Sequence, residues 1–405
     1  MNRFWVDRLE SLIAPGTYVA LAAPAPRRYR VSTRQLRFRG AIAGLLIAGC
    51  TGNAALAQVQ SEKATYRVVR LAEGLENPWA LAFLPDGRIL VTERPGRLRI
   101  VENGALSPAP LAGVPPVWAN GQGGLFDLAL HPEFAANRLV YFSYAAPVGS
   151  GALTRLARGR LGAAGLENVE TLFDSAPVGT TGRHFGGRIA FGRDGKIYLT
   201  TGDRGEERRA QDGQDLNGKL VRLEPDGKVP GDNPFVGRTD IRPEIFALGI
   251  RNTQGLVLDT AGNIWGADHG AQGGDELNRL ERGQNYGWPT ITFSRNYGIG
   301  TPVGEATSRQ GYVDGRVVWT PSIAPSGLVL YQGAAFPGWQ GSFLVGGLVS
   351  RALYRVELRP DGTNHQERLL AELGSRIRDV RVDAAGRVHI LTDARNGFLA
   401  RLDPN

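Results

Sequence analysis

A histidine and an aspartate bracket a short hairpin-like segment, HFGGRIAFGRDGKIYLTTGD, which begins at His184 and ends at Asp203. If the two side chains meet, the carboxylate accepts a hydrogen bond from one ring nitrogen and leaves the other nitrogen as a proton acceptor. A general base requires that arrangement. The alternative is structural, with His184 capping a turn and Asp203 shaping its glycine-flanked loop. The segment alone leaves both interpretations open.

Polar residues at other strand entries could join this pair. Gln122 lies in the glycine-rich stretch GQGGLFDLAL, and Arg251 and Asn252 occupy the corresponding place in FALGIRNTQGLVLD. Arg376 and Arg378 are two apart in SRIRDV, so on a strand both point to one face and imply an anionic ligand or a nearby carboxylate. For Arg251, a solvated charge on the rim is the competing interpretation.

An acidic, glycine-rich loop, ADHGAQGGDELNRLERGQNYGWP, is a candidate metal site. Asp268, Asp275, Glu276 and several main-chain carbonyls crowd this loop, and oxygen ligands suit Ca²⁺ better than zinc. The spacing is not that of an EF-hand, and acidic loops without metal are common.

Composition indicates a chain that turns often. Its 405 residues include 55 glycines and 24 prolines, which favours all-β architecture. The single cysteine, Cys50, excludes an internal disulfide. The net charge is +8, and the first 57 residues account for most of it with eight arginines and two acids. The remaining residues are nearly neutral in sum and offer no basic face for nucleic acid.

The N-terminal 57 residues have the pattern of a targeting segment rather than of a folded domain. A basic stretch, RRYRVSTRQLRFRG, precedes the apolar run AIAGLLIAGC and a small-residue site at Ala55-Leu56-Ala57. This layout predicts a secretory signal cut before Gln58, and a periplasmic or secreted protein with no transmembrane segment in the mature chain. The alternative is lipoprotein processing, which would place a lipid anchor on Cys50.

A repeated sequence pattern fills the rest of the chain. Each copy has an apolar segment, a turn, a β-rich segment, a second turn and another strand. The six copies span residues 84–101, 128–145, 189–205, 256–270, 336–358 and 380–403. Such repeats predict a single six-bladed β-propeller over residues 62–405. The segment TYRVVRLAEGL (65–75) is expected to complete the last blade, and 206–245 and 285–325 are expected to build loops on one face.

Several motifs together resemble one family, the soluble aldose sugar dehydrogenases that use pyrroloquinoline quinone. They are GLENPWALAFLPDGRILVTER, GQGGLFDLALHP, HFGGRIAFGRDGKIYLTTGD, LGIRNTQGL, DELNRLERGQNYGWP and SRIRDV, in the family's order. The resemblance runs from about residue 64 to the C-terminus. It implies a six-bladed propeller with the quinone cofactor at the mouth of the channel.

The resemblance also implies roles for individual residues. His184 would take the proton from the sugar's anomeric hydroxyl as hydride passes to the quinone, and Asp203 would orient it. Arg251 would stabilise charge developing on the quinone. The implied cofactor ligands are Gln122, His184, Arg251, Asn252, Ser322, Arg376 and Arg378. The implied calcium ligands are the carbonyls of Gly270 and Ala271, with Glu276 and Tyr286 at positions associated with additional calcium.

Two departures from the family pattern stand out. The position of the family's cofactor lysine is Val349 here, and Arg351, two residues on, would supply the missing cation if both lay on one strand face. Ala271 stands where a proline is common. The resemblance implies oxidation of an aldose to a lactone, with electrons passed to an external quinone or cytochrome. The alternatives are a calcium-dependent propeller lactonase and a non-catalytic propeller that binds a partner.

Overall fold

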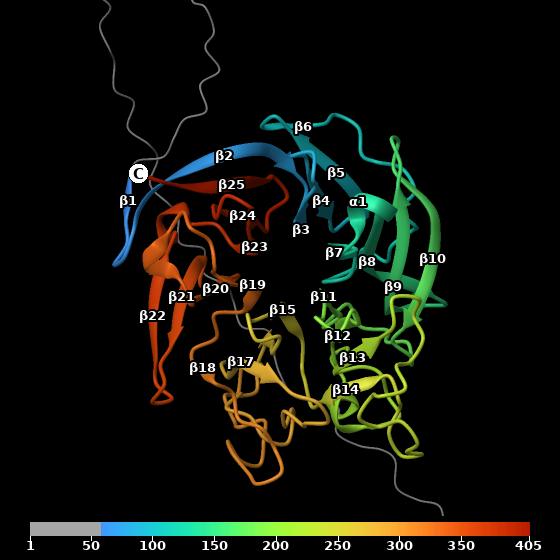
Figure 1. Cartoon of the computed structure of the whole chain (residues 1–405). Coiled ribbons are helices and arrows are strands. Elements are labelled where there is room, and N and C mark those ends of the chain that lie inside the picture. The colour runs from blue at the N-terminus through green and yellow to red at the C-terminus, as the bar shows by residue number, and fades with distance from the viewer. Residues whose placement is uncertain (1–57) are drawn as a thin grey trace, which may run out of the picture. The chain divides into compact units, whose positions relative to one another are not determined.

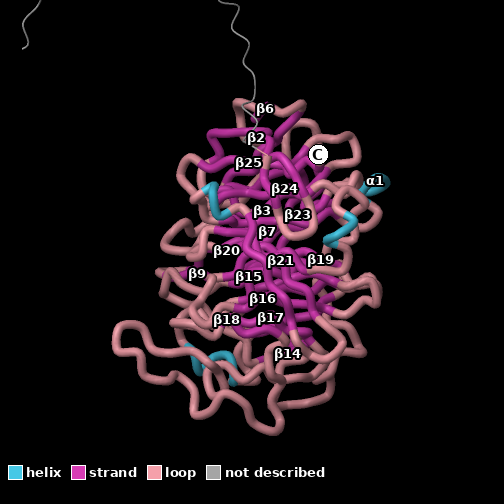
Figure 2. The backbone as a smooth tube through the Cα atoms, turned by 90° about the vertical axis from the view of Figure 1, so that its left-hand side faces the viewer, coloured by secondary structure: helices cyan, strands magenta, loops and turns pink. Residues whose placement is uncertain are grey.

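Residues 58–405, which the computed structural model describes, form six antiparallel sheets arranged as the blades of a propeller (Figure 1). The predicted all-β, six-bladed fold is confirmed. Figure 2 shows strands joined by loops, with only short helical segments among them. Among these residues there is no helix with the length and apolar character needed to span a membrane. The predicted signal segment and Cys50 lie outside the described residues.

The first three blades have four strands each. The first blade contains β3 (Pro78–Phe83), β4 (Ile89–Glu93), β5 (Arg97–Glu102) and β6 (Ala105–Leu106). The second contains β7 (Leu125–Leu130), β8 (Leu139–Val148), β9 (Gly151–Leu161) and β10 (Leu166–Asp174). The third contains β11 (Gly186–Phe191), β12 (Ile197–Thr201), β13 (Lys219–Leu223) and β14 (Ile245–Leu248).

The fourth and fifth blades also have four strands, and the sixth has five. The fourth contains β15 (Thr253–Leu258), β16 (Ile264–Asp268), β17 (Asp275–Leu280) and β18 (Val317–Trp319). The fifth contains β19 (Pro325–Leu330), β20 (Phe343–Gly347), β21 (Ala352–Leu358) and β22 (Asn364–Leu369). The sixth contains β23 (Ile377–Val382), β24 (Val388–Thr392), β25 (Gly397–Pro404), β2 (Thr65–Leu75) and β1 (Val59–Gln60). The helical segments are α1 (Phe134–Asn137), η1 (Glu207–Gln211), η2 (Pro337–Trp339) and η3 (Ala371–Leu373).

The sixth blade closes the ring with strands from both ends of the described chain. Strand β2 pairs antiparallel with β25, from Tyr66 opposite Pro404 to Leu75 opposite Gly397. The expectation that residues 65–75 complete the last blade is therefore confirmed. This pairing joins the chain ends through main-chain hydrogen bonds, so the ring has no open seam.

The two long stretches expected as loops are only partly loops. Strand β13 lies within 206–245, and β18 lies within 285–325. Strand β13 is buried along its whole length, so its sequence, KLVRL, lacks a simple apolar and polar alternation. Strand β18 has only three residues, too few to show a period.

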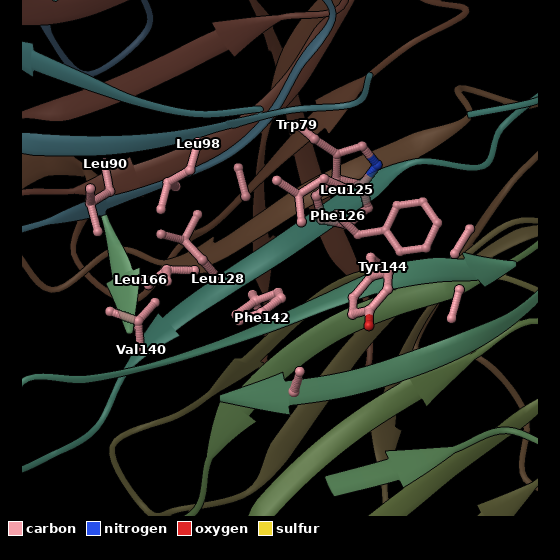
Figure 3. Packing of buried hydrophobic residues seen from close by; sticks show 14 of the residues in the cluster. Trp79, Leu90, Leu98, Leu125, Phe126, Leu128, Val140, Phe142, Tyr144 and Leu166 are labelled. Atoms are coloured by element: carbon pink, nitrogen blue, oxygen red, sulfur yellow. The ribbon is translucent and has the colours of Figure 1, made fainter. Parts of the chain in front are cut away.

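Apolar side chains fill the space between neighbouring blades. Figure 3 shows the cluster between the first two blades, where Leu90 and Leu98 face Leu128 and Phe142. Each fully buried side chain of this kind stabilises the fold by about 1.5–3 kcal/mol. The innermost strand of each blade (β3, β7, β11, β15, β19 or β23) packs against that of the next, which leaves their first residues around a central channel.

Candidate active site

A cavity of about 550 Å³ lies where the innermost strands begin, and residues from all six blades line it. Its aromatic walls are Trp79, Phe126 and Phe185. Amide groups and several arginines supply the polar part of the lining. A negatively charged molecule in this cavity would meet both aromatic rings and cations.

Irregular strand starts aim side chains into this cavity. Each innermost strand has a register shift near its first residue. Such bulges release residues from the ladder and redirect their side chains. Trp79, Phe126, Gln254 and Arg378 all lie within these shifts, and all four line the cavity.

His184 is held by its main chain and by its ring. Its φ of 49° lies in the left-handed region, where non-glycine residues are uncommon. Its backbone N–H donates to Oε1 of Gln122 at 2.8 Å, and Nδ1 lies 2.6 Å from Oδ1 of Asp203. A Cβ at Gly202 would lie 2.1 Å from the His184 carbonyl oxygen, so only glycine fits there. The structure thus brings together the pair that the hairpin suggested.

The surroundings of His184 favour the neutral form of its imidazole. Burial lowers its pKa below the ordinary value, the hydrogen bond with Asp203 opposes this, and the charge of Arg251 lowers the pKa further. Burial would raise the pKa of Asp203, but the bond to His184 and the nearby charges hold it below its ordinary range. With Nδ1–H donating to an ionised Asp203, Nε2 carries the free lone pair.

Trp288, which no sequence pattern singles out, completes this arrangement. Its indole Nε1–H donates to Oδ2 of Asp203 at 2.8 Å. The guanidinium of Arg251 lies 5.0 Å from the centre of the indole ring, within the range of a cation–π contact. Trp288 is therefore the side chain that links Asp203 to Arg251.

Asp268 fixes the main chain of the Arg251 segment. Its carboxylate accepts hydrogen bonds from the backbone N–H groups of Arg251 at 3.0 Å and Asn252 at 2.7 Å. The Asn252 side-chain oxygen in turn accepts a bond from the N–H of Gly186 at 3.0 Å. Burial raises the pKa of Asp268 to about 6, because these donors only partly offset the loss of hydration. In this role, Asp268 is a scaffold residue.

Arg376 and Arg378 both reach the cavity and share one carboxylate. Oδ2 of Asp393 lies 2.9 Å from Nη2 of Arg376 and 3.2 Å from Nη2 of Arg378. Burial opposes ionisation of Asp393, but the charges of the two arginines hold its pKa below the usual range. The Nε of Arg378 is buried and has no partner among residues 58–405. Asp393, which sequence reasoning missed, directly follows β24 in the motif TDARNG.

A second cavity, of about 640 Å³, adjoins the first and shares His269, Ala324 and Val349 with it. Gly270 and Ala271 line this second cavity, as does Ser322. The carbonyl oxygen of Ala271 accepts a hydrogen bond from the hydroxyl of Tyr297 at 2.9 Å. The lining therefore offers main-chain carbonyl oxygens, which are hard ligands.

Asp275 organises the loop behind this second cavity. Its Oδ1 accepts from the N–H of Gly270 at 2.9 Å, and its Oδ2 accepts from the Ser322 hydroxyl at 2.6 Å and the Ile323 N–H at 2.8 Å. These donors occupy the carboxylate. Within residues 58–405, no group of three or more histidine, cysteine, aspartate or glutamate side chains is placed to hold a metal ion.

His269 was not singled out from the sequence, yet it lies between the two cavities. Its Nε2 is 2.5 Å from the carbonyl oxygen of Pro325, so Nε2–H donates and Nδ1 is unprotonated. Burial, together with the charge of Arg251, lowers the pKa of His269 to about 3. The ring is therefore neutral at physiological pH.

The side chains of Glu276 and Tyr286 have different hydrogen-bond partners. The Tyr286 hydroxyl donates to the main-chain carbonyl of Arg279 and accepts from the N–H of Glu281 at 2.7 Å. The Glu276 carboxylate accepts from Asn278 at 3.0 Å, and burial raises its pKa to about 8. Their association with additional calcium stays a prediction.

The expectation that Arg351 lies on a strand beside Val349 is wrong. Residues 348–351 form the turn between β20 and β21, and Arg351 has a φ of 50°. Val349 lines both cavities, whereas the exposed Arg351 side chain reaches toward the carbonyl of Gly374 at 3.4 Å. The chain reverses between the two residues, so the two-residue period of a strand does not apply.

Comparisons with known proteins identify a family and several relatives of this chain. A family model described as Glucose / Sorbosone dehydrogenase matches residues 75–401. The aldose sugar dehydrogenase YliI of Escherichia coli is 40% identical over 347 residues, covering 84% of this chain and 94% of that protein. Quinoprotein glucose dehydrogenase B of Acinetobacter calcoaceticus is 27% identical over 423 residues, covering 83% and 87% respectively. The structure of the PQQ-bound form of aldose sugar dehydrogenase from Streptomyces coelicolor matches with a TM-score of 0.70 and 28% identity, covering 83% of this chain and 96% of that one.

Proposed function

The chain belongs to the glucose/sorbosone dehydrogenase family, and we propose that it is a quinoprotein that oxidises aldose sugars at the anomeric carbon. The observation that carries this proposal is the His184–Asp203 pair beside an arginine-rich cavity. His184 directly precedes Phe185 and Gly186, which both line that cavity. This position of a carboxylate-bound imidazole next to an arginine-lined cavity supports a base that acts beside a bound anion.

The cavity suits pyrroloquinoline quinone, a planar tricarboxylate. Four arginines and one aspartate are the charged residues of its lining, a net charge of three with His269 neutral. The buried Nε atoms of Arg251 and Arg378 also lack partners among residues 58–405. We assign Gln122, Asn252, Arg376 and Arg378 to hold the cofactor, with Ser322 at the edge of the adjoining cavity. When bound, the cofactor would supply an ortho-quinone that accepts the sugar's hydride, which carries the two electrons of the oxidation.

His184 would act as the general base on the sugar. Its Nε2 takes the proton from the anomeric hydroxyl while the C1–H bond breaks with its electron pair, and the C–O bond becomes the carbonyl of a lactone. Asp203 stabilises the imidazolium that forms, as it does the Nδ1–H in the resting site. Arg251 keeps a positive charge close to the imidazole, which favours release of the proton afterwards.

A calcium ion would bind at the carbonyls of Gly270 and Ala271. Two protein oxygens are fewer than the six to eight that Ca²⁺ takes, so oxygens of water and of the bound cofactor would complete the shell. When bound, the ion supplies Lewis acidity toward a quinone oxygen. The occupied carboxylate of Asp275 accepts from the N–H of Gly270 and so holds the loop that carries these carbonyls.

The protein would work outside the cytoplasm and pass electrons to an external quinone or cytochrome. The signal-like segment in residues 1–57 motivates this part of the proposal. If Cys50 is lipidated instead, the enzyme would be anchored. Extraction of the protein in osmotic-shock fluid, or its recovery with membranes, decides between these outcomes.

Reconstitution tests the proposal. Protein given pyrroloquinoline quinone and Ca²⁺ is expected to reduce an artificial dye with an aldose. His184→Ala should lower kcat by about 10²–10⁴-fold and keep cofactor binding. His365→Ala, on β22 and paired with Glu62, is the matched control and should behave as wild type.

Each outcome discriminates between functions. Turnover that survives His184→Ala would refute the base. Calcium-dependent lactone hydrolysis without the quinone would favour a lactonase. Absence of quinone binding by spectroscopic titration would overturn the proposal and leave a partner-binding propeller.

A further inference from the structure

Two arginines in the main cavity have no carboxylate partner. Arg376 and Arg378 share Asp393, but Arg94 and Arg395 line the same cavity and form no ion pair with any residue of 58–405. Arg94 is half-buried and Arg395 is exposed, so both guanidinium groups can present their charge to an anion that enters the cavity. Their placement therefore indicates an anionic group of a ligand.

The main chain brings these two arginines to one place. Arg94 directly follows β4 and Arg395 lies in the turn after β24, on blades that neighbour each other where the ring closes. Asn77 joins them: its N–H donates to the carbonyl of Ala394 at 2.8 Å, and its own carbonyl accepts from the N–H of Arg94 at 3.0 Å. Asn77 itself has a φ of 46° and lines the cavity.

The carboxylate of Glu76 is already engaged by another arginine. The pKa of Glu76 is lowered mainly by its hydrogen bond with Arg97, and the charges of both Arg395 and Arg94 add to this. Glu76 does not neutralise either of them, because its carboxylate bonds to Arg97 at 2.7 Å.

The two side chains differ in how firmly they are held. The guanidinium of Arg94 donates to the carbonyl of Gly121, next to the cofactor ligand assigned at Gln122. The Arg395 side chain is exposed and makes no hydrogen bond with residues 58–405. Arg94 is thus a fixed donor, and Arg395 is free to close on a ligand.

We propose that Arg94 and Arg395 form a second anion-binding pair, which holds a carboxylate of the quinone cofactor at the junction of the first and sixth blades. This inference rests on the proposed function. The pair adds positive charge to a cavity in which Val349 stands at the lysine position, and Arg351 was the sequence-based candidate for that charge. Arg351 does not line the cavity and reaches toward Gly374 instead.

Cofactor affinity is the measurement that tests the pair. Tryptophan fluorescence quenching by pyrroloquinoline quinone, at fixed Ca²⁺ and low salt, gives Kd without any turnover. Arg395→Ala should weaken binding about tenfold, the effect of losing one charge-assisted contact. Arg351→Ala is the matched control, also an exposed arginine in a turn, and should leave Kd unchanged.

Two further variants separate charge from shape. Arg94→Lys keeps the charge and should retain most of the affinity, whereas Arg94→Gln should lose about tenfold or more. The trimethyl ester of the cofactor, which lacks the negative charges, should bind wild type and Arg395→Ala equally.

The outcomes distinguish this inference from the proposed function. Wild-type binding that Arg395→Ala and Arg94→Gln leave unchanged would overturn the pair alone, as would a loss confined to Arg351→Ala. If wild type binds no quinone, the proposed function fails, and the inference that rests on it falls with it.

Discussion

Trp288 offers a test of the histidine–aspartate pair that alters neither member. Its Nε1–H donates to Oδ2 of Asp203 at 2.8 Å, and Trp288→Phe removes this donor while keeping a ring beside Arg251. A hydrogen bond to a charged group contributes about 1.5–3 kcal/mol. For a domain of this size, we expect the thermal midpoint to fall by roughly 2–4 °C.

The same change should alter the proton affinity of His184. Without the indole donor, Asp203 interacts more strongly with the imidazolium form. The pKa of His184, which burial holds below its ordinary value, therefore rises. A base with a higher pKa becomes protonated sooner as pH falls. The acidic limb of log kcat/KM against pH should then move to higher pH by about 0.5–1 unit, since one unit corresponds to about 1.36 kcal/mol.

Trp319→Phe is the matched control for this experiment. Trp319 is also buried, and its Nε1–H donates to Oε1 of Gln366 at 2.7 Å, in the fourth blade and outside both cavities. It should lower the thermal midpoint without moving the pH profile. An acidic limb unchanged in Trp288→Phe, or displaced equally in both variants, would refute the role given to Trp288.

Three further predictions follow from single contacts. Gly202→Ala places a Cβ 2.1 Å from the His184 carbonyl oxygen, so kcat should fall at least about tenfold; Gly231→Ala, in open space, should not change it. Asp268→Asn leaves a main-chain N–H of Arg251 or Asn252 without an acceptor, and should cost about 1–3 kcal/mol in urea unfolding; wild-type stability would contradict the scaffold role. The pKa of His269 falls from 6.5 to about 3 on folding, so between these pH values the unfolded chain binds more protons than the folded chain. The stability that the neutral ring contributes is therefore complete above pH 6.5 and is lost as pH falls toward 3. His269→Gln should flatten that decline in urea midpoints, and an unchanged slope would contradict it.

The fold was predictable because its signals are local. Each blade repeats a turn between two apolar segments, and residues 65–75 form a strand of matching character that pairs with β25. The contact between His184 and Asp203 could be predicted from the sequence for the same reason. Gly186 pairs with Thr201 in one hairpin, so the residues just outside these two are brought together by the pairing itself.

The rest of the site depends on features without a sequence period. Trp288 reaches Asp203 across 85 positions, and nothing in the spacing of the two residues announces that contact. The register shifts that release Trp79 and Arg378 add a residue where the two-residue rule assumes none. Arg351 was misplaced by the same rule, because the chain turns before reaching it.

The charge of the channel is distributed in a way that points to the ligand. Away from the cavity lining, Arg188 lies 2.9 Å from Asp379, and Arg381 lies 2.9 Å from Asp127. These two cations and two carboxylates neutralise each other, as buried ions must if they are not to cost several kcal/mol each. Arg188 also packs 4.1 Å from the ring of Trp79, which stiffens the cavity wall. Arg94 and Arg395, by contrast, line the cavity without an ion-pair partner among residues 58–405, so an anionic ligand there would meet positive charge that the protein itself does not match.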